Sequence, residues 1–389
     1  MKHFEDLKMP DTEKPDDEKA EQQQSAADPA EAWGSTVAVR ESEAVLPEWL
    51  DDFISEIGAF HSCGNRRYQH TLDLTVAEVK VYLGTYFPRS WCEAFCIAGN
   101  LFRNERFMAS LKDELAEGNE INILDIGCGS GGEIIGLLDA IREHLPHSVR
   151  INVHAFDGNE ISLGCMRKVA EAYRERFSAE IKVTDRFRMI ESDSDLAAMA
   201  DEVRGIKFDF ILFCKTGNEL ISREIISDPY MRVAELFSGL LNNSGLLLIL
   251  DVTMHLEFTS MIASRPVLTD LWVPQAMSGE LCRFVSSQDE FGTLIPKPCG
   301  RHPQCRGGCY MKQTFTVRHS GTSGDVSKVC YWIICRNSLK DKLVPDSVMD
   351  ETQIFDPDKS YNRTRRDWRD GACQYSGGDR DADAFNLNS

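Results

Sequence analysis

The feature that most constrains the fold of this chain is a glycine-rich loop between an apolar strand pattern and an apolar helix pattern. The strand-like run Ile-Leu-Asp-Ile ends at residue 126, six residues of Gly-Cys-Gly-Ser-Gly-Gly follow, and a helical pattern begins at Glu133. This order is typical of the first strand, loop and helix of a nucleotide-binding α/β sheet. Gly127, Gly129 and Gly131 allow a tight turn and a close approach of the backbone to a ligand, because they carry no Cβ atom.

The charges around the loop narrow the choice of nucleotide. The glycines at 127, 129 and 132 also satisfy the dinucleotide pattern G-x-G-x-x-G. Asp125 lies where a dinucleotide-binding strand is usually apolar, and Glu133 in the first helical turn would repel a pyrophosphate. A zwitterionic amino-acid moiety carries an ammonium group and tolerates both acids. The alternative is a glycine loop that serves only as a turn.

The pattern Asp-x-Gly-x-Gly-x-Gly over 125–131 resembles motif I of the class I S-adenosylmethionine (SAM)-dependent methyltransferases. The resemblance implies an α/β fold with a Rossmann-like, mostly parallel sheet and an antiparallel C-terminal hairpin. It also implies SAM as the cofactor, with contacts from Asp125, Gly127, Gly129 and Gly131. Methyl transfer mainly needs alignment of the reacting atoms, and the sequence identifies no catalytic side chain.

Composition and pattern divide the chain into six regions. The 389 residues are 42% hydrophobic, which allows a large core, and the net charge is −19. The first 50 residues hold 13 acidic and 5 basic residues, so the start of the chain reads as a disordered acidic tail. We expect this tail over 1–42, a helical region over 43–118, a SAM-binding core over 119–255, an insertion over 256–312, strands that complete the sheet over 313–344 and a flexible tail over 345–389.

The core region alternates strand and helix patterns. We predict strands over 122–126, 149–156, 187–191, 208–214 and 246–252, followed by a hairpin of 313–319 and 329–336 with its loop at 320–325. Helices are expected from the glycine loop to His144, over 162–177 and over 231–241. The last of these helices is predicted to stop in the loop Asn-Asn-Ser-Gly at 242–245.

Acidic residues near the predicted strand ends are candidates for cofactor contacts. Asp157 ends the second strand, where an acid accepts hydrogen bonds from ribose hydroxyls in this architecture. The alternative is an aspartate that caps the next helix. Asp193, with Ser192 and Asp195 as rivals, is the candidate for the adenine amino group.

Asn218 and Glu219 follow the fourth strand at the edge where open α/β sheets bind ligands, and we expect them to face the substrate. The alternative is that Glu219 only stabilises a helix N-terminus through the helix dipole.

The chain also contains a cluster of cysteines that could bind a metal. It has 13 cysteines and no apolar signal segment at its N-terminus, which favours reduced thiols or metal ligands in a cytoplasmic protein. Cys299, Cys305 and Cys309 are close enough in sequence to hold zinc or an iron–sulfur cluster. Cys330 is our choice of fourth ligand, and the other candidates are Cys282, Cys335, His302 and His319. Three incidental cysteines are the alternative.

Nucleic-acid binding is suggested only locally. An acidic chain is not a general polyanion binder, so contact with RNA requires a local basic patch. The segment 359–369 holds five basic residues and two aromatic residues, which suits charge and stacking contacts with RNA, although a solvated tail fits the same pattern. The longest apolar run, at 246–250, is too short to span a membrane, so no membrane contact is expected.

Several segments between 75 and 336 together resemble a narrower group, the methyltransferase-like proteins associated with the small ribosomal subunit. These are residues 86–94, 208–220 and 245–251, the cysteine cluster, and 327–334. The resemblance implies a role in small-subunit assembly, with ribosomal RNA or a ribosome-associated molecule as methyl acceptor and the cysteines as metal ligands. The alternatives are a non-catalytic assembly factor that binds SAM or metal, and a small-molecule methyltransferase.

Overall fold

The computed structural model describes residues 42–62, 72–262, 265–295 and 311–343. They belong to the second of two units, Ala38–Ser389, and the first unit, Met1–Val37, lies outside them. The predicted acidic tail over 1–42 and the predicted flexible tail over 345–389 therefore fall almost wholly outside the described residues. The same is true of the segment that holds Cys299, Cys305 and Cys309.

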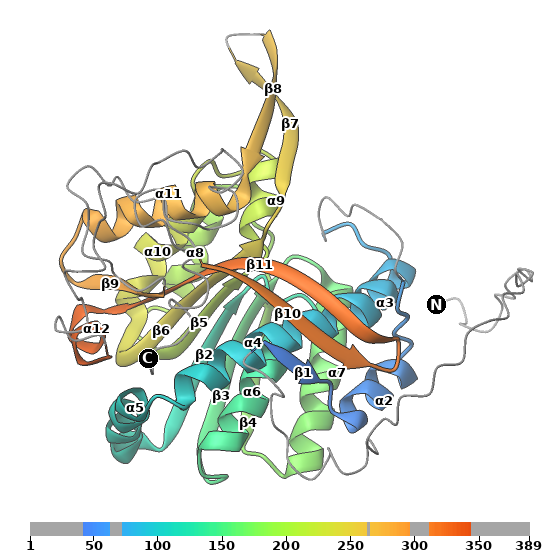
Figure 1. Cartoon of the computed structure of the whole chain (residues 1–389), viewed down its shortest axis with the longest axis vertical. Coiled ribbons are helices and arrows are strands. Elements are labelled where there is room, and N and C mark those ends of the chain that lie inside the picture. The colour runs from blue at the N-terminus through green and yellow to red at the C-terminus, as the bar shows by residue number, and fades with distance from the viewer. Residues whose placement is uncertain (1–41, 63–71, 263–264, 296–310, 344–389) are drawn as a thin grey trace, which may run out of the picture. The chain divides into compact units, whose positions relative to one another are not determined.

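A nine-stranded sheet forms the centre of the described fold (Figure 1). Its main path is β1 (Glu43–Val45), β10 (Met311–His319), β11 (Thr322–Arg336), β6 (Leu241–Val252), β5 (Phe208–Cys214), β2 (Glu120–Ile126), β3 (Arg150–Asp157) and β4 (Ile181–Phe187), and β9 (Phe291–Ile295) pairs with β11. The five strands from β6 to β4 are parallel, whereas β11 runs antiparallel to β6, β9 and β10. The expected fold class is confirmed: a Rossmann-like, mostly parallel sheet with an antiparallel C-terminal hairpin.

Helices cover both faces of the sheet. One apolar cluster joins one face to α2 (Glu48–Glu56), α4 (Phe87–Phe102), α5 (Glu105–Gly118), α6 (Gly132–His144) and α7 (Glu160–Phe177). The other face packs against α8 (Asp193–Glu202), α9 (Gly217–Ser222), α10 (Pro229–Phe237) and α11 (Val273–Ser286). The remaining elements are α3 (Val76–Thr85), the 3₁₀ turn η1 (Ser238–Leu240), α12 (Asn337–Leu343) and a separate hairpin of β7 (His255–Ile262) and β8 (Arg265–Trp272).

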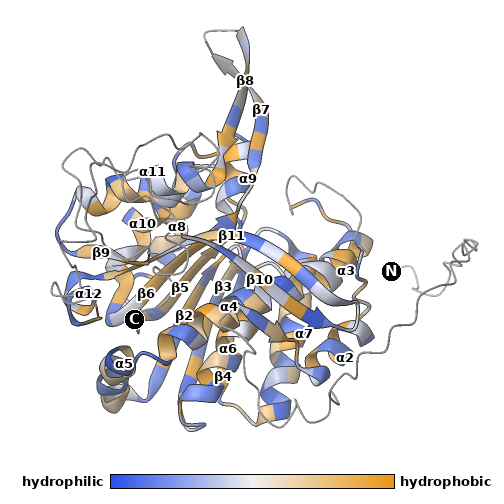
Figure 2. Ribbon diagram, viewed as in Figure 1, coloured by the Kyte–Doolittle hydropathy of each residue, from blue (hydrophilic) through white to orange (hydrophobic). Residues whose placement is uncertain are grey.

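The strand sequences explain this two-sided burial. In β2, Ile121 and Ile123 belong to one apolar cluster while Leu124 and Ile126 belong to the other, as the two-residue period of a strand requires. All seven residues of β5 are buried, which is typical of a parallel strand covered on both faces. Figure 2 shows the same concentration of apolar residues along the central strands.

Several predicted boundaries are wrong, and the hairpin loop is shorter than the predicted 320–325 because β11 already begins at Thr322. The third strand occupies 181–187 rather than 187–191, because β4 lies at the sheet edge and alternates apolar with polar residues, which weakens its apolar signal. The predicted glycine stop at 242–245 instead belongs to β6, which already begins at Leu241 and pairs there with Phe208 before a shift in register. Tertiary pairing thus overrides the local turn composition.

The N-terminal region and the insertion contribute strands that periodicity did not reveal. The three residues of β1 pair in parallel with β10 at the sheet edge. Within the predicted insertion, β9 pairs with β11, and β7 and β8 form the hairpin seen at the top of Figure 1. β1 and β9 have only three and five residues, so they carry little periodic signal.

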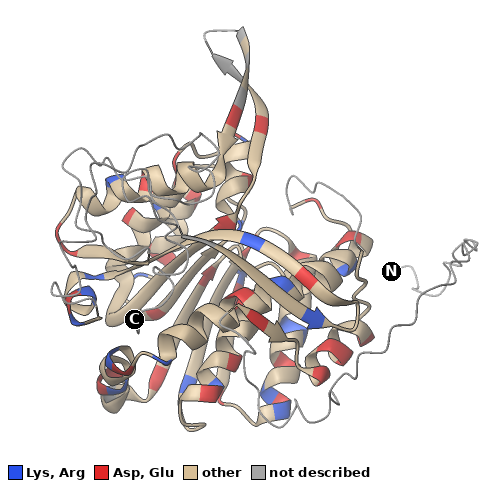
Figure 3. Ribbon diagram, viewed as in Figure 1, with Lys and Arg blue, Asp and Glu red and all other residues tan. Residues whose placement is uncertain are grey.

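Surface charge is mixed on some helices, such as α5 and α7, whereas the charged residues of α2 are all acidic (Figure 3). Acidic and basic residues alternate on α5 and α7 rather than gathering by sign. No helix within the described residues is both long enough and apolar enough to span a membrane.

Candidate functional site

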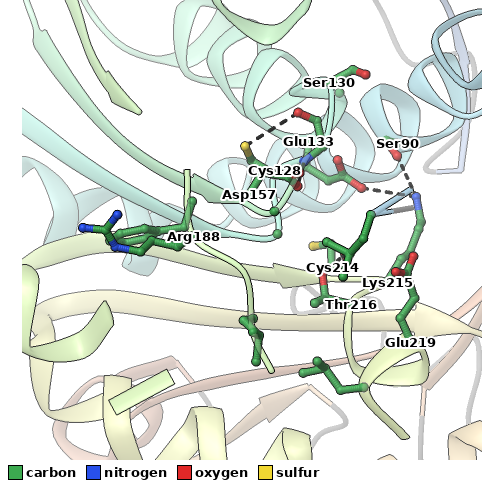
Figure 4. Close-up of a pocket in the computed structure, with 18 of the residues that line it drawn as sticks. Ser90, Cys128, Ser130, Glu133, Asp157, Arg188, Cys214, Lys215, Thr216 and Glu219 are labelled. Atoms are coloured by element: carbon green, nitrogen blue, oxygen red, sulfur yellow. Dashed lines mark hydrogen bonds and ion pairs between the residues drawn. The ribbon is translucent and has the colours of Figure 1, made fainter. Parts of the chain in front are cut away.

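The site lies where the strand order of the sheet reverses. From β2 the chain continues outward to β3 and β4, and then returns to place β5 on the other side of β2. In open α/β sheets, ligands bind at such a switch point, outside the carboxyl ends of the strands. A cavity occupies this position, bordered by the ends of β2, β3 and β5 (Figure 4).

The glycine loop forms one wall of the cavity, and three of its glycines have left-handed backbone angles. The φ angles are 83° at Gly127, 52° at Gly129 and 85° at Gly131. A Cβ atom at Gly127 would lie 2.1 Å from Oγ1 of Thr216, so this glycine lets the β2 and β5 loops meet. A Cβ atom at Gly129 would meet nothing within 4 Å, so this position leaves space for a ligand beside the backbone.

Asp157 ties this loop to the end of β3. Its Oδ2 atom accepts a hydrogen bond of 2.7 Å from the backbone N–H of Gly129, and its Oδ1 atom accepts one of 2.7 Å from the N–H of Asn159. Burial raises the pKa of Asp157 to about 6, against the opposing effect of these two hydrogen bonds. Each carboxylate oxygen can still accept a second hydrogen bond. Asp157 can therefore hold the loop and a ligand hydroxyl together.

Lys215 places a positive charge on the opposite side of the cavity. Its Nζ atom lies 3.3 Å from Oε1 of Glu133 and 2.8 Å from Oγ of Ser90 (Figure 4), and 2.5 Å from Oε2 of Glu93. Its φ angle of 59° is left-handed, a conformation that costs a non-glycine residue about 1–2 kcal/mol. This strained conformation in the loop after β5 directs the ammonium group toward α4 and α6.

The carboxylates of Glu93 and Glu133 determine the protonation state of Lys215. Burial by itself would lower the pKa of Lys215, but Glu93 and Glu133 outweigh it and the pKa is raised. Burial raises the pKa of Glu93, which is fully buried, and the attraction of Lys215 opposes that rise. Lys215 therefore remains a cation, and it can bind an anionic group but cannot act as a general base.

The rest of the lining mixes apolar and polar residues. Arg188 lies at the end of the cavity away from Lys215 in Figure 4. The remaining residues come from several elements: Leu72, Tyr82, Phe87, Cys128, Ser130, Gly132, Phe156, Gly158, Ile190, Met199, Cys214, Leu220 and Arg223.

The predicted site residues are only partly gathered at the cavity. Gly127, Gly129, Asp157 and Glu219 line it, whereas Asp125, Gly131 and Asn218 do not. Asp125 is buried in β2 beneath the loop, and burial raises its pKa well above the ordinary value. A Cβ atom at Gly131 would lie 2.6 Å from Cγ of Met166, so this glycine serves helix packing.

Asp193 and Asn218 have other partners. Asp193 begins α8, outside the cavity lining, and forms an ion pair of 2.6 Å with Arg232 of α10. The side chain of Asn218 donates a hydrogen bond of 2.7 Å to Asp251, which also accepts one of 2.8 Å from the hydroxyl of Tyr230. Asn218 thus anchors α9, and Glu219 is the residue of this pair that faces the cavity.

Of the four predicted cysteine ligands, Cys330 is the one within the described residues, whereas Cys299, Cys305 and Cys309 lie outside them. Cys330 is fully buried in β11, with Sγ 3.5 Å from the carbonyl oxygen of Asp251 and 3.9 Å from Sδ of Met277. Burial raises the pKa of this thiol well above its ordinary value, which disfavours a thiolate ligand.

Sequence reasoning missed Lys215, Ser90 and Glu93. Lys215 carried a positional signal, because it directly follows β5 at the ligand-binding edge. The signal for Glu93 was a single carboxylate inside the apolar helix α4, since a charged residue in a helix that is buried on all sides requires a partner. Which partner it has depends on how α4 packs against α6 and the β5 loop.

No protein-family model matches this chain, and no curated protein sequence does. Among solved structures, a SAM-dependent methyltransferase from Clostridium acetobutylicum has 10% identity and a TM-score of 0.28, with 60% of this chain and 91% of that chain covered. The plantazolicin methyltransferase BpumL in complex with SAH has 13% identity and a TM-score of 0.30, covering 64% and 89%. The rRNA methyltransferase aviRa from Streptomyces viridochromogenes has 17% identity and a TM-score of 0.24, covering 41% and 77%.

The TM-scores of these likenesses are all 0.30 or lower, so none of them assigns a family or an activity to this chain. The strand order and the glycine loop at the switch point define a Rossmann-like α/β fold independently of these likenesses. The narrower resemblance to the small-ribosomal-subunit group receives no support from the comparisons.

Proposed function

We propose that this protein is a SAM-dependent methyltransferase that binds SAM between the glycine loop and Asp157. The observation that carries the proposal is the joining of these two elements at the switch point of the sheet, where Gly129 donates its N–H to Asp157. A loop used only as a turn would not need a buried carboxylate at its tip. It would also not need a left-handed Gly129 whose missing Cβ leaves open space.

The residues present fit the parts of SAM. Asp157 can accept hydrogen bonds from the ribose hydroxyls, and the apolar Phe156, Ile190 and Met199 can contact the adenine ring. At the other end, Glu133 and Lys215 offer one charge of each sign to the ammonium and carboxylate groups of the methionine part. This matching of charge distinguishes SAM from a dinucleotide, whose pyrophosphate would meet Glu133.

The chain's own residues orient and polarise the reaction. When bound, SAM supplies a sulfonium methyl group that an in-line nucleophile displaces. Lys215 remains a fixed cation beside α4 and α6, so it can hold an anionic group and cannot remove a proton. Glu219 lines the same cavity from the first turn of α9, and we assign it the role of contacting the acceptor and receiving its proton.

The acceptor is the open part of the proposal. Ribosomal RNA or a ribosome-associated molecule is the first candidate, on the resemblance of residues 75–336 alone, and the alternatives are a small-molecule acceptor and a non-catalytic SAM-binding assembly factor. The decisive experiment is incubation of the purified protein with SAM labelled in the methyl group and a lysate separated into RNA, protein and small-molecule fractions. Label in one fraction identifies the acceptor class. Tight SAM binding without label in any fraction supports the non-catalytic factor.

SAM binding itself is tested by calorimetry on the full chain. We expect saturable binding by the wild type, and a loss for Asp157→Ala. Absence of measurable SAM binding by the folded wild type would overturn the proposed function.

A further inference from the structure

A second polar cluster lies outside the cofactor cavity, at the tip of the β10–β11 hairpin. His61, His319 and Asp325 each offer one ligand atom, and these atoms all lie within 4.8 Å of one another. His61 comes from the segment after α2, His319 ends β10, and Asp325 lies in β11. In Figure 1 the hairpin tip points toward α2 and α3, the two helices that flank the His61 segment.

Two glycines let these segments approach each other. A Cβ atom at Gly84 would lie 2.4 Å from the backbone of Phe60, so Gly84 allows the segment with His61 to lie directly on α3. A Cβ atom at Gly321 would lie 2.5 Å from Cβ of His61 and 2.9 Å from Cε1 of His319. The hairpin turn therefore has room for both histidine rings only because residue 321 is glycine.

Hydrogen bonds fix the same arrangement from both sides. The N–H of Ser62 donates to Oγ1 of Thr85 over 3.1 Å, next to His61. The N–H and hydroxyl of Ser320 donate to the carboxylate of Asp51 in α2 over 2.6 and 2.8 Å, next to His319. The rings of His61 and His319 meet edge to face with their centroids 5.1 Å apart.

Asp325 and His319 direct polar atoms toward each other without a hydrogen bond. Nε2 of His319 and Oδ2 of Asp325 are 3.7 Å apart, and their side chains are 2% and 6% exposed. Both atoms are buried without a hydrogen-bond partner among the described residues. Buried polar atoms without a hydrogen-bond partner are rare, because burial removes their hydration.

The remaining contacts of Asp325 orient it for an additional ligand. Its Oδ1 atom accepts a hydrogen bond of 2.6 Å from Nη2 of Arg89. Arg89 thus holds one oxygen of Asp325 while the other lies toward His319, in the way that outer contacts orient the ligands of a metal site.

We propose that His61, His319 and Asp325 bind one divalent transition-metal ion, with zinc as the first candidate. Two imidazoles and a carboxylate are a ligand set that zinc uses, with a fourth position open to water. Bond lengths of about 2.0–2.1 Å in a tetrahedron separate ligand atoms by about 3.3 Å, so rotations that close the present spacing of up to 4.8 Å by as much as about 1.5 Å complete the site. If Nε2 of His319 is the ligand atom, the ring proton moves to Nδ1, and the 3.2 Å contact from the N–H of Gly321 to Nδ1 is given up.

The metal would join the hairpin tip to the segment that precedes α3. That helix carries Tyr82, which lines the cofactor cavity, and Arg89 of the neighbouring helix α4 is followed directly by Ser90, a partner of Lys215. Metal binding would therefore stabilise one wall of the cavity without contributing to the methyl-transfer step. The proposal does not depend on the identity of the cofactor.

The test measures metal content and metal-dependent stability of the full chain. Cys299, Cys305 and Cys309 are replaced by serine first, so that thiolates do not contribute. In that background we expect about one Zn²⁺ or Co²⁺ per chain, a Co²⁺ spectrum typical of nitrogen and oxygen ligands, and a rise in melting temperature on adding Zn²⁺. His319→Gln and His61→Gln should each abolish all three signals.

A matched control is His255→Gln, because His255 also pairs with an aspartate, Asp270, in the β7–β8 hairpin. We expect it to keep the full metal content. If His319→Gln fails to fold, His61→Gln decides the matter by the same measurements. Equal metal content and equal Zn²⁺ stabilisation in the background protein and in folded His61→Gln would overturn the proposal.

Discussion

The backbone N–H of Gly129 donates a hydrogen bond to Oδ2 of Asp157 over 2.7 Å, which joins the loop after β2 to the end of β3. A loop glycine and a strand-end carboxylate that are 28 residues apart in sequence thereby form one unit. The same carboxylate oxygens are the proposed acceptors for the ribose hydroxyls. Loop geometry and cofactor affinity should therefore respond together to changes at Asp157.

The first prediction concerns Asp157 itself. Asp157→Ala removes the proposed ribose acceptor and the partner of the Gly129 N–H, and hydrogen bonds to charged groups contribute about 1.5–3 kcal/mol each. We expect SAM affinity to fall by about 10- to 100-fold in calorimetry. Asp185→Ala is the control and should leave SAM affinity unchanged. Asp185 lies in the edge strand β4 and pairs with Arg167 of α7. Equal affinity of Asp157→Ala and wild type would contradict the assignment.

The second prediction separates two glycines of the loop. Gly129→Ala meets no atom within 4 Å, so it should fold with a loss of about 1–2 kcal/mol from its left-handed angle, while its methyl group obstructs the ligand. Gly127→Ala places a Cβ atom 2.1 Å from Thr216 and should lose more stability. Urea unfolding and SAM titration distinguish the two effects. The control Gly164→Ala lies in α7 with open space around its Cβ position and should change neither SAM affinity nor the fold.

The third prediction is a pH dependence of SAM binding. The pKa of Asp157 in the free protein is raised to about 6, and ribose hydroxyls donate hydrogen bonds to the ionised form. SAM binding therefore favours proton release, so affinity should be full above that pKa and should weaken as pH falls through it. At about pH 5, Asp157 is ionised in only about a tenth of the free protein molecules. The loss of SAM affinity is therefore limited to about tenfold. In Asp157→Asn, SAM affinity should no longer depend on pH between about pH 7 and 5. If the dependence persists in this variant, another titrating group causes it.

The fourth prediction concerns the charge cluster of Lys215. Lys215→Met leaves Glu93 buried without its cation, and breaking a buried pair in this way costs about 3–5 kcal/mol. In the variant, the pKa of Glu93 rises further above its unfolded value, so the stability deficit should be largest above that pKa and should shrink as pH falls. Urea unfolding at several pH values measures both.

The double variant Lys215→Met with Glu93→Gln should recover more than half of the lost stability, because the uncompensated charge is removed. Lys207→Met is the control, since Lys207 donates only to the carbonyl oxygen of Gly239 at the surface. A loss in the double variant as large as in the single variant would show that lost packing, not charge, explains the effect.

The sequence predicted the central strands because their residues are buried on both faces and therefore read as continuous apolar runs. Phe208–Cys214 was placed without error for this reason. Ile181–Phe187 was misplaced because an edge strand needs only part of its residues to be apolar. Residues 242–245 have the composition of a helix stop, but they belong to β6. Their pairing depends on the neighbouring strand β5, which local composition cannot reveal.

For the site, the sequence by itself determined the glycine loop and the carboxylate at the end of β3, because left-handed angles and strand-end acids leave a local signature. Only the tertiary structure decided that Lys215 meets Glu93 and Ser90, and that His61 meets His319 and Asp325. These groups come from segments far apart in the chain, so their proximity depends on how helices and the hairpin pack. Burial then strengthens their charge interactions, since little water remains to screen them.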